Sequence, residues 1–166
     1  MDIRLAKFND IEAMRTIYNQ SVAVGYQTAD IYPVSFEDRV AWFNAHSPEK
    51  YPIFVIEEEN RVLGYLSISA YRVGRMALRY TAEVSYYIHE DYQRRGIASI
   101  LLEHALEICP ALEIKTLFGI LLDSNKASYK FLEKFGFEKW GHLPLVADFD
   151  GVEVGHLYYG LRLKER

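Results

Sequence analysis

The sequence predicts a single α/β domain over residues 1–166, with a mixed, mostly antiparallel sheet and helices on both of its faces. Three observations favour this fold. The 166 residues are half hydrophobic, which is enough for one core and too few for two separate ones. Strand-like and helix-like segments follow one another in the order β-α-α-β-β-β-α-β-α-β-β. No linker, repeat or low-complexity run interrupts them.

The first third of the chain predicts one strand and two helices. A short strand is expected at residues 3–6. Asn9 is expected to cap the first helix, because Glu12 stands three residues later at the capping-box position. In the same way, Ser35 is expected to cap a second, shorter helix with Asp38 at its box position.

The rest of the chain predicts alternating strands and helices. Apolar runs at 53–56 and 62–68 flank a polar turn and indicate an antiparallel hairpin. There follow a basic loop at 72–79, a strand at 82–88, a helix at about 95–108, a strand at 117–122, a helix ended by Gly136, and strands at 137–140 and 154–163.

Composition excludes several classes of protein. The net charge of −4 and the sequence pI of about 5.7 disfavour a nucleic-acid-binding surface. No segment approaches the length and hydropathy of a membrane span, and the five histidines show no metal-ligand spacing. Cys109 is the only cysteine, so an internal disulfide is impossible and a packed structural thiol is expected. A cytoplasmic enzyme without a metal is therefore expected.

A candidate anion site follows the strand at 84–88. The chain passes an acidic turn and reaches 93–98, where a helix is expected to open. The first N–H groups of a helix lack partners and carry positive potential, so they can bind a diphosphate. Arg94 and Arg95 add charge, and Gly96 allows close approach to the main chain. The same hexapeptide is also compatible with a solvated basic turn.

This segment resembles the coenzyme A loop of the GNAT acetyltransferase superfamily, Q/R-x-x-G-x-G/A, with Gln93, Gly96 and Ala98 at the fixed positions. The element order also matches the GNAT fold along nearly the whole chain. Asn125-Lys126-Ala127-Ser128, followed by Gly136-Phe137, is similar to a second family pattern. The resemblance implies acetyl-CoA as the co-substrate. It implies cofactor contacts from Tyr86, Tyr87, Ile88, Arg94, Arg95, Gly96, Ile97, Ala98, Ser99 and Asn125.

A narrower resemblance concerns the segment Tyr80-Thr81-Ala82-Glu83. It is similar to the W/Y-T-A-E of the phosphinothricin and methionine-sulfoximine N-acetyltransferases. This likeness implies that Glu83 is the general base that takes a proton from the acceptor ammonium, directly or through water. The structural alternative is an ion pair of Glu83 with Arg79 or Arg75.

The same likeness implies further features of the site and the assembly. Substrate contacts are expected from Thr28 and Tyr80. Arg75 of the basic loop is a further candidate, because its charge suits a substrate carboxylate, although a solvated basic loop is the alternative. A homodimer is expected, with the strand at 157–161 and the loop at 26–32 near the interface. The richness in tyrosine and phenylalanine permits such an interface without requiring it.

The sequence departs from the family at two places. Leu132 occupies the position where many members have a tyrosine general acid, which leaves Tyr86, Tyr158, Tyr159 or water for that role. The G-x-W-x-D-V segment of the subfamily is replaced by residues 151–156, without the tryptophan or the aspartate.

Three hypotheses for function remain. The leading one is transfer of an acetyl group to a small-molecule amine, an amino-acid analogue such as phosphinothricin or methionine sulfoximine or sulfone. A second changes the acceptor to a peptide N-terminus or a polyamine, although the basic loop at 72–79 disfavours a polyamine. A third is a non-catalytic acyl-CoA-binding module, which Leu132 favours and Glu83 disfavours.

Overall fold

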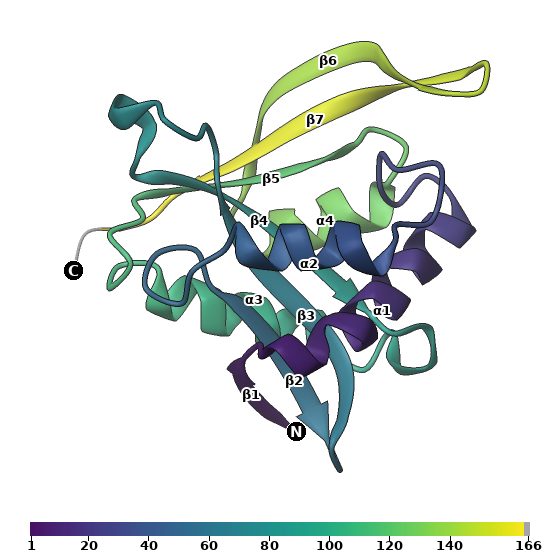
Figure 1. The fold of residues 1–166 in the computed structure, drawn as a ribbon. Helices are drawn as coiled ribbons and strands as arrows, with labels where there is room; N and C mark the ends of the chain where they lie inside the picture. The colour runs from purple at the N-terminus through teal and green to yellow at the C-terminus, as the bar shows by residue number, and fades with distance from the viewer. Residues whose placement is uncertain (165–166) are drawn as a thin grey trace.

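The computed structural model describes residues 1–164 and contains a seven-stranded sheet in the order β1-β2-β3-β4-β5-β7-β6 (Figure 1). Neighbouring strands are antiparallel except for β4 and β5, so the predicted mixed, mostly antiparallel sheet is confirmed. The elements are β1 Asp2–Leu5, α1 Ile11–Val24, α2 Phe36–Asn44, β2 Ile53–Glu58, β3 Arg61–Ala70, β4 Thr81–Ile88, α3 Ile97–Ile108, β5 Thr116–Leu122, α4 Lys126–Lys134, β6 Glu138–Phe149 and β7 Val152–Arg162, with 3-10 turns at Phe8–Asp10, Met76–Leu78 and Glu90–Tyr92.

Helices cover both faces of the sheet, as the sequence predicts. Successive side chains of a strand point to opposite faces, so a strand that is covered on both sides needs an unbroken apolar run. On β2, Ile53 and Val55 pack in a cluster with α1, whereas Phe54 and Ile56 pack in a second cluster with α3. The apolar run at 53–56 is thus explained by burial on both faces.

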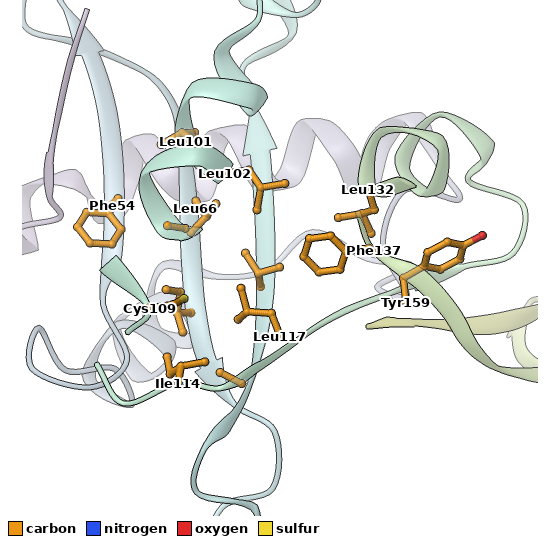
Figure 2. Close-up of a cluster of buried hydrophobic side chains, with 14 of the residues drawn as sticks. Phe54, Leu66, Leu101, Leu102, Cys109, Ile114, Leu117, Leu132, Phe137 and Tyr159 are labelled. Carbon is orange, nitrogen blue, oxygen red and sulfur yellow. The ribbon is translucent and has the colours of Figure 1, made fainter. Parts of the chain in front are cut away.

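The larger cluster joins α3 and α4 to the sheet. Figure 2 shows Leu101 and Leu102 of α3 beside Leu66 of β3, and Leu132 of α4 beside Phe137. Cys109 lies in the same cluster, and its burial raises the pKa of the thiol to about 12. A thiol in this state is protonated and unreactive at neutral pH.

The predicted cap of the first helix is wrong, whereas that of the second is confirmed. Before α1 the chain makes a 3-10 turn, and Asp10, rather than Asn9, accepts the N–H of Lys7 at 2.7 Å. Asp10 is favoured because Arg4 of β1 binds the same carboxylate through two N–H groups, at 2.7 and 3.0 Å. At α2, the N–H of Asp38 donates to the Ser35 hydroxyl at 3.0 Å.

The strand β6 is longer than predicted and forms one edge of the sheet. The sequence predicts a strand at 137–140, but β6 runs to Phe149 and pairs with β7 with two register shifts. Pro144 breaks the apolar alternation, and an edge strand tolerates a proline because its outward N–H group needs no partner. The β6–β7 hairpin extends away from the helices (Figure 1).

Candidate active site

The sheet opens between β4 and β5. The register between these parallel strands is short: Thr81–Glu83 of β4 pair with Thr116–Phe118 of β5. Beyond Glu83, β4 continues along β3 as far as Ile88, while β5 continues along β7, and the two strands diverge (Figure 1). From Val84 to Ile88, β4 therefore has a partner strand on one side only. Its outward N–H and C=O groups are available to an extended ligand that lies along the strand.

A cavity of about 920 Å³ lies at this opening. Its walls come from the end of α1 and the loop after it, from β4 and β5, from the first turns of α3 and α4, and from β7. The predicted site residues that line it are Thr28, Glu83, Tyr86, Tyr87, Ile88, Arg94, Gly96, Ile97, Ala98, Ser99 and Asn125. The structure thus brings together segments that are far apart in the chain, from Ser21 at the end of α1 to Tyr158 of β7.

The start of α3 fits an anionic group. Gly96 is the N-cap residue with φ +77°, and no side chain caps the helix. A Cβ atom at Gly96 would meet no other atom within 4 Å, so there is open space over the first turn. Ile97 is buried and anchors the turn, while Ala98 and Ser99 line the cavity. Free N–H groups beside Arg94 can bind a diphosphate.

Three of the predicted contacts lie outside this cavity. The guanidinium of Arg95 lies 3.8 Å from the Glu58 carboxylate and over the ring of Tyr92. Arg75 is exposed in the loop at 72–79. Tyr80 accepts a hydrogen bond from Arg79 at 3.0 Å, and its ring carries that guanidinium.

Glu83 lies where the strands separate. It is mostly buried, and desolvation raises the pKa of its carboxyl above the ordinary value of 4.5. In residues 1–164, no cation lies within ion-pair distance of it, and Arg79 bonds instead to the Met76 carbonyl and to Tyr80. The alternative ion pair with Arg79 or Arg75 therefore does not form in this structure. A raised carboxyl pKa makes a better proton acceptor near neutral pH.

Two of the three tyrosines considered as the general acid line the cavity. The Tyr86 hydroxyl lies 2.9 Å from Ser128 Oγ, and burial, partly offset by this bond, raises the pKa of Tyr86 to about 12. Tyr158 also lines the cavity. Tyr159 instead donates to Glu133 at 3.1 Å. Leu132 is buried at the cavity wall and offers no proton.

Asn125 combines a structural contact with a place in the cavity wall. Its Oδ1 accepts the N–H of Ser128 at 3.3 Å, which caps α4. The amide NH₂ of the same side chain remains available to an acceptor in the cavity. The cap and the predicted contact with an amide-bearing ligand are therefore compatible.

The sequence did not identify the contribution of β5 to the site. Residues 119–122 line the cavity, as do Ser128, Phe131 and His156. Burial lowers the pKa of the His156 imidazole. Gly119 was the available signal, since a glycine inside a strand often marks a close approach. A Cβ at Gly119 would lie 2.5 Å from Leu132 Cδ1, so the glycine allows α4 to pack against β5.

The described part of the chain contains no group of three or more His, Cys, Asp or Glu that could hold a metal ion. Among its helices, none is both long and apolar enough to cross a membrane.

The opened sheet, the uncapped start of α3 and the partly buried carboxylate of Glu83 contribute to one cavity, an arrangement suited to an extended ligand with an anionic group. The chain belongs to the acetyltransferase (GNAT) family, whose pattern matches residues 11–137. It is accordingly an acetyl-CoA-dependent N-acetyltransferase, as the resemblance at the Gln93–Ala98 loop implies.

Relatives support this assignment over the whole domain. YwnH of Bacillus subtilis, provisionally named a phosphinothricin acetyltransferase, is 43% identical over 91% of this chain and 92% of its own. The L-methionine sulfoximine/L-methionine sulfone acetyltransferase of Pseudomonas paraeruginosa is 33% identical over 87% and 84%. The yncA structure from Salmonella typhimurium, which contains acetyl-CoA, has a TM-score of 0.91 at 28% identity and covers 100% of this chain and 95% of its own.

Proposed function

We propose that this protein transfers the acetyl group of acetyl-CoA directly to the amine of a small amino-acid analogue, such as phosphinothricin or methionine sulfoximine or sulfone. The observation that carries the proposal is the position of Glu83. This partly buried carboxyl has a raised pKa and no cationic partner in residues 1–164, and it lines the cavity where the sheet opens. The names of two relatives support the choice of acceptor.

Different parts of the site have different roles in this proposal. Acetyl-CoA, when bound, supplies a thioester carbonyl carbon that an amine can attack. The first turn of α3 binds the diphosphate through free N–H groups, and the open edge of β4 holds the pantetheine arm as a neighbouring strand would. Glu83 accepts the proton of the acceptor ammonium. Tyr86, which burial keeps protonated, and Tyr158 are hydroxyl donors within the same cavity.

The test is release of coenzyme A thiol from acetyl-CoA across a panel of amines. The panel contains phosphinothricin, methionine sulfoximine, methionine sulfone, free amino acids, spermidine and short peptides. We expect the highest kcat/KM for one of the amino-acid analogues. A preference for spermidine or for peptides would replace the proposed acceptor. Binding of acetyl-CoA without turnover of any amine would instead support the non-catalytic module.

We also propose that the protein is a homodimer in the cytoplasm. The predicted interface strand at 157–161 lies inside the sheet, paired on both sides by β5 and β6, so it has no free edge. The edge strand β6 offers a better surface, because it exposes large apolar side chains. They are Trp140, Leu143, Leu145 and Val146. The loop at 26–32 is exposed, and Tyr26 packs against Phe149 of β6. The buried free thiol of Cys109 is consistent with a reducing compartment.

A further inference from the structure

A second, smaller cavity of about 260 Å³ adjoins the cofactor cavity. Glu83, Ser85 and Tyr87 line both cavities, so the two meet along one face of β4. This face is the one that α1 and α2 cover. The other lining residues are Tyr18, Asp30, Arg39, Trp42, Tyr65, Ser67 and Ser69.

Arg39 is the unusual residue in this cavity. It comes from α2 and is only 6% exposed. Its guanidinium lies between two aromatic rings, 4.2 Å from the centre of Tyr18 and 4.0 Å from that of Trp42. Tyr65 accepts one hydrogen bond from it. The Nε–H of Arg39 is buried and has no acceptor in the described part of the chain.

The environment of Arg39 lacks a counter-ion. In residues 1–164, no carboxylate lies within ion-pair distance of its guanidinium. Asp30 lines the same cavity, but it is exposed and accepts the hydroxyl of Tyr18. A buried charge without a partner is costly, and the two rings satisfy only the faces of the guanidinium. Its in-plane N–H donors remain suited to a planar oxyanion.

We propose that this smaller cavity binds the acceptor as a zwitterion, with its carboxylate on Arg39 and its ammonium at Glu83. This inference deepens the proposed function and rests on it. The carboxylate supplies the anion that Arg39 lacks, and Glu83 supplies the negative charge that the ammonium requires. The nitrogen is thereby placed at the boundary with the cofactor cavity, where the acetyl group arrives.

The proposal makes Arg39 a determinant of specificity. Arg75, which the sequence suggested for a substrate contact, lies outside both cavities. The apolar residues that neighbour Arg39 in α2 predict simple packing of this helix, so the sequence does not single out Arg39. An arginine three residues before Trp42 falls on the same helical face as that ring, and this spacing was the available signal.

The test compares two acceptors that differ only in the acidic group: L-methionine sulfone and its α-carboxamide. For the wild-type enzyme we expect kcat/KM for the acid to exceed that for the amide by at least about tenfold, the scale of a charge-assisted pair. Arg39→Met keeps an unbranched stem and removes the charge. It should lower kcat/KM for the acid by at least about tenfold and for the amide by less than about threefold.

Arg162→Met is the matched control, because Arg162 is exposed on β7 and bonds to Thr116 Oγ1 at 3.0 Å. Arg162→Met should keep the wild-type ratio of kcat/KM for the acid to kcat/KM for the amide. Equal losses for acid and amide in a folded Arg39→Met protein would overturn the proposal, as would loss of the preference in Arg75→Met instead. If Arg39→Met does not fold, the comparison of the two acceptors with the wild-type enzyme is the test. Equal kcat/KM for the acid and the amide then refutes a carboxylate contact.

A separate measurement distinguishes this inference from the proposed function. If neither compound is acetylated, the proposed function fails for this acceptor. Calorimetric titration of the wild type, saturated with coenzyme A, then tests binding alone. Tighter binding of the acid than of the amide supports the carboxylate site, whereas equal binding or none overturns it.

Discussion

Glu83 and Phe118 form the last registered pair between β4 and β5. Glu83, the candidate base, is therefore paired with both neighbouring strands, whereas the residues that follow it in β4 lie at the opening of the sheet. A strand pair fixes the backbone of Glu83 within a rigid element, whereas the divergence after it gives a ligand access to the carboxyl. Rigid placement of this kind is what proton transfer at hydrogen-bond distance requires.

The first prediction concerns proton transfer. Glu83→Gln keeps the shape of the side chain and removes its basicity. We expect kcat near neutral pH to fall by about 10²–10⁴-fold, the usual contribution of a general base. Steady-state thiol release measures the turnover, and titration with acetyl-CoA should give nearly unchanged affinity. Turnover kept within about threefold would assign deprotonation to another group.

The same substitution should change stability with pH. Burial raises the pKa of Glu83 above 4.5, so the folded protein binds this proton more tightly than the unfolded chain does. Stability is consequently lost as the pH rises from the unfolded pKa through the folded one. Glu83→Gln removes this loss, and its Tm should exceed that of the wild type by about 1–3 °C at pH 8. The difference should shrink near pH 4, whereas Glu153→Gln on the exposed end of β7 should show no such trend.

The cofactor site can be tested at Gly96. Gly96→Asp places a negative charge where the diphosphate is expected, at a φ of +77° that also strains the new residue. Loss of one charge-assisted bond costs about 1.5–3 kcal/mol. Calorimetric titration should show coenzyme A affinity reduced at least about tenfold. Gly151→Asp is a control on the β6–β7 turn, since this glycine also has a positive φ, +100°, and lies away from the cavity. Unchanged affinity in folded Gly96→Asp would refute the loop as the diphosphate site.

The ion-pair network around Asp10 should contribute to stability. Burial alone would raise the pKa of Asp10, but the hydrogen bonds from Arg4 and the Lys7 N–H lower it below 3.8. This stabilisation is present above pH 3.8 and is lost as the pH falls through the folded pKa. Asp10→Asn should lower the free energy of unfolding by about 1–3 kcal/mol at pH 7. Urea denaturation measures it, with exposed Asp2→Asn as the control. A deficit of the same size at pH 2 would contradict the charge argument.

The assembly has a direct test. Light scattering at micromolar concentration should give a mass near twice the 19.3 kDa of one chain. Leu145→Glu puts a charge on the exposed apolar surface of β6 and should shift the mass toward that of the monomer. Val73→Glu is the control, because Val73 is exposed in the loop at 72–79. A monomeric wild type would exclude the dimer and leave the acceptor site to one chain.

Most of the fold could be predicted because its signals are local. The apolar run at 53–56 and the Ser35–Asp38 box each depend on neighbours in the chain, and the structure confirms both. The predicted cap of α1 is wrong because the contacts at the start of this helix involve a residue outside the segment. At the start of α1 no side chain caps the helix; the Asp10 carboxylate instead binds Arg4 of β1 and accepts the N–H of Lys7, and nothing within the Asn9 segment reports the contact with Arg4.

The candidate site shows the same division. Gly96 and Ala98 could be assigned to one site from the sequence, because the loop and the helix start are contiguous, and both residues line the larger cavity. The environment of Arg39 could not be predicted, since Tyr18, Tyr65 and Glu83 reach it from three separate elements. The position of Arg95 also depended on a distant residue, because Glu58 on the β2–β3 hairpin attracts its guanidinium away from the cavity.

The short register between β4 and β5 has a consequence for stability. In the described part of the chain, the strands β1–β4 and β5–β7 form two subsheets that are in register with each other over three residue pairs, preceded by hydrogen bonds from the N–H groups of Lys115 and Thr116 to the Tyr80 carbonyl. If the pantetheine arm lies along the free edge of β4, as proposed above, it extends this short ladder on the β4 side. A ligand bound there would stabilise the folded protein by mass action, so the temperature of unfolding is expected to rise with the concentration of acetyl-CoA.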